Sequence, residues 1–369
     1  MPFIPLYIQQ LGVTAPERLR FWVGLLDAVP SLAMGVMAPV WGLLSDRLGR
    51  KLMILRAMIF GTVIVGCMAI AGNVETVFVL RIAQGMLTGT ITAAATLVAT
   101  GTPSNKMSSA LGLLSSSTFI GLSFGPLIGG VAAEVFGFRV SFLIGSSIIF
   151  IGFVLVLIFI KEPKSTLMSG RTDKVRFSPG LIFTAPFGTL FILILMERFS
   201  RMLPRTFLPL YVQQLRATPD GVSAITGAIS AAGGVATALA SLTLTRLGDR
   251  HDRSTLLRIF FAAAGVAAMP IFFKQNLIWF TVFYLVSLYL IGAIYPLLQS
   301  QLSTMTHPSN RGAVFGLQTS AASVGWFFSP LAGSAIAIYL DLRYIFLFFS
   351  ISLFLSFVLL SFLRRMNVE

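Results

Sequence analysis

The sequence predicts an all-α membrane protein made of two related helix bundles, on the strength of its composition and an internal repeat. Of the 369 residues, 56% are hydrophobic and only 11% are charged, whereas about 25% of the residues in a soluble domain are charged. This composition excludes ordinary soluble enzymes, disulfide scaffolds and disordered proteins. The single cysteine, Cys67, lies in an apolar run, which excludes a disulfide framework and a thiolate zinc site.

Apolar runs of about 20 residues are long enough to cross the hydrocarbon core of a bilayer as helices. Residues 1–11 are typical of the end of one such span. Proline and glycine inside the runs are compatible with this interpretation, because both are common in transmembrane helices. Eleven further complete spans are expected, with ends good to a few residues, at 21–44, 52–72, 76–100, 108–133, 140–160, 188–212, 221–246, 255–273, 277–301, 312–338 and 344–363.

The basic residues predict the orientation of these spans. A formal net charge of +14 suggests a nucleic-acid binder when taken alone. However, 17 of the 27 Lys and Arg residues fall in one set of alternate loops and six in the other set. Cytoplasmic loops carry the excess of Lys and Arg in membrane proteins. We therefore expect a multi-pass protein of the cytoplasmic (inner) membrane that binds no nucleic acid, with the polar segment 161–187 and the C-terminus inside.

The second half of the chain repeats the first after about 204 residues. The segment FIPLYIQQL at 3–11 recurs as FLPLYVQQL at 207–215, and Pro126 and Gly129 recur as Pro330 and Gly333. Parallel halves with a substrate path between them are an established plan of secondary transporters. The repeat predicts an N-terminal bundle over 1–160, a cytoplasmic linker over 161–187 and a C-terminal bundle over 188–369.

The repeat also predicts that the first helix is incomplete. Phe207 follows an apolar run that begins near Gly188, whereas only two residues precede Phe3. We expect the first half to lack most of its first helix, through an upstream start codon or a truncated gene. A truncated remnant that does not transport is one of the alternatives that this leaves open.

The segment GLLSDRLGRK at 42–51 resembles the signature G-x-x-x-D-R-x-G-R-R/K of the major facilitator superfamily. The resemblance implies the fold of that family, two pseudo-symmetric bundles of six helices, and a cytoplasmic latch that stabilises the outward-open state. A solvated charged loop is the alternative, and the weaker copy at 249–253 departs from the signature at His251 and Asp252. The residues of this gating motif are Gly42, Asp46, Arg47, Gly49, Arg50 and Lys51.

Two other segments resemble motifs of proton-coupled members of the superfamily. LRIAQG at 80–85 resembles the motif that places an arginine in the fourth helix, and GLSFGPLIGG at 121–130 resembles the fifth-helix motif of antiporters. Together the motifs resemble the drug:proton antiporter family of twelve-span multidrug resistance proteins. Helix packing through small residues is the alternative for the glycine pattern. The antiporter motif consists of Gly121, Gly125, Pro126, Gly129 and Gly130.

Arg81 is a charge inside a predicted span, where each charge costs roughly 2.5 to 3.5 kcal/mol on insertion scales. In the repeat it aligns with Tyr284 or Leu285 and so has no charged counterpart. We expect Arg81 to serve proton coupling or to lock helices near the cavity. The alternative is that its side chain reaches the outer interface, because it lies only some five residues into its span.

The predicted span 188–212 carries Glu197, Arg198, Arg201 and Arg205. At about 100° per residue these side chains fall at 0°, 100°, 40° and 80°, on one arc of the helix. Glu197 and Arg201 are spaced to pair. We expect a cavity-facing stripe in which Glu197 carries a proton or contacts substrate, or alternatively a cluster that locks this helix to a neighbour. The stripe's net charge of +2 favours anionic or zwitterionic cargo, or requires an acid from the first helix.

Asp27 is the other carboxylate within a span. Burial favours the uncharged, protonated form of a carboxyl group, so a buried Asp27 could take up and release protons. The alternative is an exposed acid at the start of a helix. Aromatic residues in the spans are candidates either for an accommodating cavity or for packing against lipid. They are Tyr7, Tyr211, Tyr289, Tyr295, Trp326, Phe327 and Phe328.

The sequence contains no pattern for metal, cofactor or ATP. The two histidines lack partners at metal-ligand spacing, and no Gly-Lys-Ser/Thr phosphate loop is present. We therefore expect no enzyme, but a monomeric secondary transporter that exports drugs or other small hydrophobic molecules in exchange for protons. An uptake carrier or facilitator for a sugar or metabolite is the rival with the same scaffold.

Overall fold

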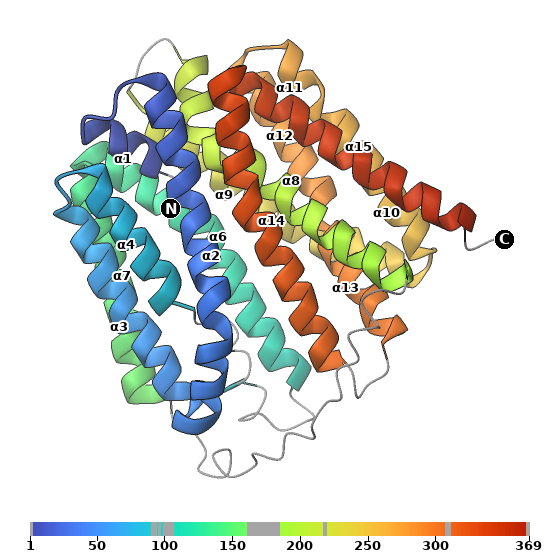
Figure 1. Cartoon of the computed structure of the whole chain (residues 1–369), viewed down its shortest axis with the longest axis horizontal. Coiled ribbons are helices and arrows are strands. Elements are labelled where there is room, and N and C mark those ends of the chain that lie inside the picture. The colour runs from blue at the N-terminus through green and yellow to red at the C-terminus, as the bar shows by residue number, and fades with distance from the viewer. Residues whose placement is uncertain are drawn as a thin grey trace.

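The computed structural model describes residues 3–89, 94, 97–98, 107–160, 185–216, 220–306 and 311–366, with the side chains of a few residues inside these helices excepted. The described chain folds into helices that run side by side (Figure 1). Two predicted segments lie largely outside the described residues. One is the linker 161–187, and the other is the part of the span 76–100 that follows Gly89.

The first half of the chain forms one group of helices. Helix α3 packs against α7, α2 against α4, and α6 against α7. The helices of this half are α1 (Ile4–Gln10), α2 (Pro16–Leu48), α3 (Arg50–Ala69), α4 (Val74–Leu87), α6 (Met107–Phe136) and α7 (Phe138–Phe159).

The second half forms the corresponding group, in which α10 packs against α15, α9 against α12, and α8 against α14 and α15. The elements of this half are α8 (Ala185–Leu215), α9 (Val222–Thr243), the 3-10 helix η4 (Thr245–Asp249), α10 (Arg253–Ala268), α11 (Pro270–Phe273), α12 (Leu277–Gly292), α13 (Ile294–Met305), α14 (Arg311–Tyr339) and α15 (Leu342–Met366).

Eight helical stretches of the described chain are long and apolar enough to cross a membrane. Helix α7 is the most exposed of them, with only 6% of its apolar window buried inside the protein, as expected for a helix whose side chains face lipid. Helix α8 is also long, at 31 residues, but carries the four charges of the predicted stripe.

Several predicted spans are interrupted. The span 255–273 divides at Met269, just before Pro270, into α10 and α11, and the span 277–301 divides at Ala293 into α12 and α13. Proline at position 270 lacks the amide hydrogen that would continue the helix. At the second interruption Pro296 cannot donate to the carbonyl of Gly292, and Tyr295 lies just before this proline, in the first turn of α13.

The two halves repeat the same internal contacts. The ring of Phe3 covers Gly129 and the ring of Phe207 covers Gly333, so that an added Cβ would lie 3.2 Å from the first ring and 2.6 Å from the second. The hydroxyl of Tyr7 donates to the carbonyl of Met68 at 2.7 Å, and that of Tyr211 donates to Ile271 at 3.5 Å. Equivalent side chains therefore fix equivalent helix positions.

The halves meet along two seams, α6 with α9 and α2 with α14. A Cβ added to Gly227 would lie 2.6 Å from the carbonyl oxygen of Pro126, and one added to Gly24 would lie 2.7 Å from that of Pro330. These are equivalent pairs, each joining a glycine of one half to a proline of the other. By the predicted orientation, this close contact lies toward the outer side of the membrane.

Candidate functional site

Arg81, which is buried, and Asp27, which is partly buried, form an ion pair between α4 and α2. The Nη2 atom of Arg81 lies 2.9 Å from Oδ1 of Asp27, and only 6% of Arg81 is exposed. Its Nε donates to the carbonyl of Leu26 at 2.9 Å and its Nη1 to the side chain of Gln84 at 2.7 Å. Gly85 allows this approach, because an added Cβ there would overlap the backbone of Pro30.

Two alternatives from the sequence are wrong. Arg81 does not extend to the outer interface, because three acceptors hold its guanidinium inside the protein. Asp27 is not an acid at a helix start, because α2 begins at Pro16 and the carboxylate lies about three turns into the helix.

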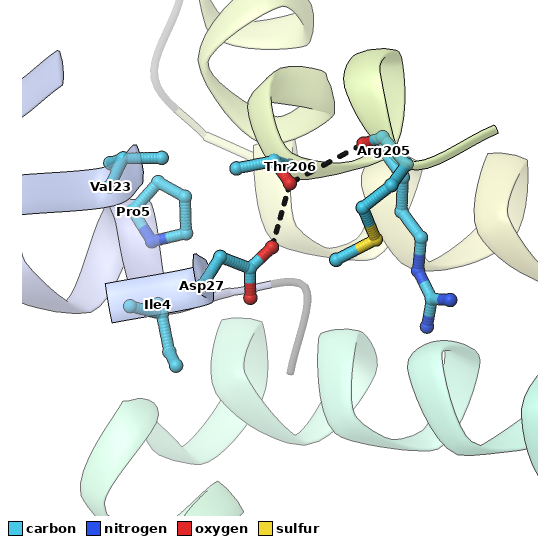
Figure 2. A pocket seen from close by; sticks show the side chains of 7 residues that line it. Ile4, Pro5, Val23, Asp27, Arg205 and Thr206 are labelled. Atoms are coloured by element: carbon cyan, nitrogen blue, oxygen red, sulfur yellow. Dashed lines mark hydrogen bonds between the residues drawn. The ribbon is translucent and has the colours of Figure 1, made fainter. Parts of the chain in front are cut away.

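Asp27 also bonds to the opposite half of the protein. The hydroxyl of Thr206, on α8, donates to Oδ2 of Asp27 at 2.7 Å (Figure 2). A second acceptor, the carbonyl of Met202 in the same helix, lies 3.4 Å from this hydroxyl. The carboxylate of Asp27 is therefore shared between Arg81 of its own half and Thr206 of the other half.

A small cavity of about 110 Å³ lies beside this contact. Figure 2 shows Asp27 and Thr206 pointing toward each other at its wall, while the guanidinium of Arg205 extends away from them. Arg205 is exposed, and in the part of the chain that the structure describes it forms no ion pair. The cavity is lined by Ile4, Pro5, Val23, Asp27, Met202, Arg205 and Thr206.

Glu197 forms a second charged cluster with two of the other stripe residues. Its side chain is completely buried, and its Oε1 accepts from Nε of Arg201 at 2.8 Å. Its Oε2 lies 3.4 Å from Nε of Arg198, and neither of these two atoms has a hydrogen-bond partner. A buried carboxylate oxygen without a hydrogen bond is costly, so Oε2 depends on the positive charge of Arg198 beside it.

Arg198 is held by aromatic rings. Its guanidinium lies 3.6 Å from the ring centre of Tyr295 on α13 and 5.3 Å from that of Trp326 on α14. The hydroxyl of Tyr295 in turn accepts from the amide of Gln318 at 2.7 Å. The predicted stripe therefore divides: Glu197, Arg198 and Arg201 meet, whereas Arg205 lines the separate cavity beside Asp27.

The structure describes only part of the predicted gating motif. The surroundings of Gly42 and the side chains of Asp46 and Arg47 lie outside what is described. Gly49 joins α2 to α3 with a φ of +95°, a conformation that favours glycine. Arg50 begins α3, and Nζ of Lys51 donates to the carbonyl of Leu157 on α7 at 2.9 Å.

The antiporter motif lies partly on the seam between the halves. A Cβ on Gly130 would lie 2.5 Å from the carbonyl oxygen of Ser223, and Pro126 is the residue that approaches Gly227. Gly129 instead contacts Phe3 of its own half, while Gly121 and Gly125 face open space. The small residues of this motif therefore differ in what they contact.

Thr206 and the pairing of Asp27 with Arg81 could not be found from the sequence. Thr206 is nine residues from Glu197 and so about 180° away from it on α8, which excludes it from the charged stripe. Tyr295 and Trp326 were among the aromatic candidates, but nothing in their spacing relates them to Arg198.

Comparison with known proteins gives a consistent result across the whole chain. The sequence profile described as Major Facilitator Superfamily matches residues 1–236 and 190–368. The chain is 31% identical over 353 residues to the multidrug resistance protein MdtG of Dickeya zeae, covering 94% of this chain and 85% of that protein. It is 32% identical over 348 residues to the multi-drug resistance efflux pump PmrA homolog of Lactococcus lactis, covering 93% and 85%.

Solved structures share the fold at low sequence identity. A bacterial homolog of the human lysosomal transporter Spinster, in an inward-facing and occupied conformation, matches with a TM-score of 0.79 at 14% identity, covering 99% of this chain and 92% of that one. The nucleoside transporter NupG matches with a TM-score of 0.81 at 12% identity, covering 98% and 94%.

Proposed function

Because the chain belongs to the major facilitator superfamily and is a multi-pass transporter of the cell membrane, we propose that it exports drugs or other small hydrophobic molecules in exchange for protons. The relatives described above carry the names of multidrug resistance and efflux proteins. Their similarity extends over more than nine tenths of the chain.

The single observation that supports proton coupling is the unequal hydrogen bonding of the two carboxylate oxygens of Glu197. One of its oxygens is satisfied by Arg201, whereas Oε2 is buried without a hydrogen bond. A proton on Oε2 would remove the negative charge that holds Arg198 and Arg201. Loading and unloading this proton therefore changes how α8 interacts with its surroundings, which a proton-driven carrier requires.

Asp27 provides a second place where charge and conformation are linked. Its hydrogen bond to Thr206 exists only while α2 and α8, from opposite halves, are in contact. When the halves separate at this end, the Thr206 hydroxyl retains the carbonyl of Met202 as an acceptor. The two conformations therefore differ in the hydrogen bonds to Asp27, and such a difference is what allows a ligand or proton to bias them.

Transport would proceed by rocking of the bundles 1–160 and 188–369 about a site near the middle of the membrane. In the proposal, the residues 42–51 act as the cytoplasmic latch of the outward-open state, and Pro126 and Gly130 of the antiporter motif form the outer seam of the inward-open state. Segment 161–187 would connect the bundles on the cytoplasmic side. A single chain contains both walls of the path, so we propose a monomer.

The test is dye flux in proteoliposomes with and without an imposed pH gradient. Wild-type protein is expected to move ethidium faster with the gradient, and Glu197→Gln is expected to abolish the gradient-dependent part. Glu75→Gln, at an exposed acid, serves as the matched control and is expected to behave like the wild type. Flux that ignores the gradient would instead indicate a facilitator, and accumulation in the direction of proton flow an uptake carrier.

A further inference from the structure

We infer that Arg198 fills a cation subsite of the transport path, and that a planar organic cation in the cargo takes this subsite by displacing Arg198. The inference rests on the proposed function and specifies the chemistry of its cargo. It is carried by three neighbours of the Arg198 guanidinium, which are Tyr295, Trp326 and Glu197.

The subsite consists of two aromatic faces and one carboxylate oxygen. Tyr295 lies 3.6 Å and Trp326 5.3 Å from the guanidinium, both within the range of cation–π attraction. Oε2 of Glu197 lies 3.4 Å from Nε. Aromatic faces combined with a negative charge are the surroundings in which proteins bind organic cations.

The contacts of Arg198 are those of a replaceable group. Among the described residues Arg198 forms no hydrogen bond, and its buried Nε is unsatisfied. Arg201 differs, because it donates both to Glu197 at 2.8 Å and to the carbonyl of Ile291 at 3.2 Å. Displacing Arg198 therefore breaks ring and charge contacts only, and a cation without N–H groups can reproduce both.

The backbone assembles this subsite at helix interruptions and close approaches. Tyr295 lies two residues beyond the break at Ala293 and directly before Pro296, whose missing amide hydrogen weakens the helix there. Gly325 brings α14 against α8, because an added Cβ would lie 2.6 Å from the carbonyl oxygen of Leu195. All the elements involved belong to one half, so the subsite persists while the halves move.

The charge that faces Glu197 at this position favours cationic over anionic cargo. The charge count along α8 favours an anion, but that count treats the arginines as equivalent. When cargo replaces Arg198, one cation substitutes for another, and the balance with Glu197 and Arg201 is unchanged. An anion at the same position would meet Glu197 and the negative faces of two rings.

The test measures binding of ethidium to the purified full-length protein by fluorescence, separately from transport. Arg198→Gln is expected to tighten ethidium binding about tenfold, because an internal competitor that occupies the site nine tenths of the time weakens apparent affinity by that factor. Arg198→Lys retains a competing cation and is expected to stay within about threefold of the wild type. Adding Tyr295→Leu to Arg198→Gln is expected to reverse the gain.

Two controls keep the result specific. Arg201→Gln removes an equal charge from the same carboxylate but from outside the subsite, and is expected to give no gain. The uncharged planar dye N-phenyl-1-naphthylamine is expected to bind all variants alike. Unchanged or weaker ethidium binding by Arg198→Gln, in a variant that retains its elution volume, would overturn the inference.

The binding test of the subsite and the flux test of the proposed function can fail independently of each other. Gradient-driven flux in the wild type without the Arg198→Gln gain would leave proton-coupled export standing and remove the subsite. The binding gain without any dependence of flux on the gradient would establish the subsite and remove proton coupling.

Discussion

Gln9 and Gln213 bond to each other through both of their amide groups. Nε2 of Gln9 lies 3.0 Å from Oε1 of Gln213, and Nε2 of Gln213 lies 3.2 Å from Oε1 of Gln9. The two residues are equivalents in the 204-residue repeat, so each bonds to its own counterpart. A reciprocal pair of this kind marks the axis that relates the two halves, at the end where they are in contact.

Breaking this pair should open the contact between the halves. Gln9→Ala or Gln213→Ala is expected to cost the closed conformation about 1 to 2 kcal/mol, because the remaining amide loses its partner, and the double variant less than the sum. Ile4→Cys, in a Cys67→Ser background, reports opening through its labelling by an impermeant maleimide from the outer side. Gln214→Ala is the matched control, since Gln214 bonds to Asp341 within its own half.

Removing the Thr206 hydroxyl should uncouple Asp27 from the opposite half. Thr206→Val keeps the shape of the side chain and is expected to reduce gradient-driven flux about tenfold or more, the value of a hydrogen bond to a charged group. Thr206→Ser should restore most of the flux. Thr281→Val is the control, because the Thr281 hydroxyl bonds only to Leu277 in its own helix; equal losses in both variants would show that the contact with Asp27 has no special role.

Arg81 and Asp27 should behave as a unit in stability measurements. Arg81→Leu leaves the partly buried Asp27 carboxylate without its ionic partner and is expected to cost about 1.5 to 3 kcal/mol, whereas removing both charges costs much less. The measurement is thermal unfolding of the purified protein, followed by tryptophan fluorescence. A double variant Asp27→Leu/Arg81→Leu that is less stable than Arg81→Leu alone would contradict the pairing.

The glycines of the seams should differ from the other glycines of the antiporter motif. Gly227→Val places its methyl groups against the carbonyl of Pro126 and is expected to prevent the halves from closing at the outer end, which the Ile4→Cys labelling would report as permanent access. Gly125→Val, in the motif but facing open space, should leave labelling unchanged. If both substitutions act alike, the motif works by some means other than close approach.

Much of the fold follows from the sequence because hydrophobic length and an internal repeat are local signals. The family matches confirm the fold class, and within the described residues helices lie in the expected runs, with α4 described only as far as Leu87 of the run 76–100. The spans 255–273 and 277–301 are expected to be unbroken because their hydropathy is continuous, whereas the structure interrupts them at Met269 and Ala293. A proline at position 270 or 296 gives a local reason for each interruption, because it lacks the amide hydrogen of a helical residue.

The sequence predicts which charged residues belong to the site, but not which of them contact each other across helices. Arg81 and Glu197 were singled out because charge is rare in a membrane span, and their burial agrees with that reasoning. Periodicity relates residues on one helix, which is how the bond between Glu197 and Arg201 was expected. The contact of Asp27 with Thr206 joins residues 179 positions apart on different halves, and no single-helix pattern contains that information.

The interruption before Tyr295 has a consequence for the range of compounds that the protein can accept. Because Pro296 cannot donate to the carbonyl of Gly292, the helix that continues from α12 into α13 bends at this point at less cost than elsewhere. The distance between the Tyr295 ring and Trp326 is then adjustable by a backbone pivot. Tolerance for guests of different thickness would arise from that pivot, and stiffening it should narrow the repertoire before it lowers turnover.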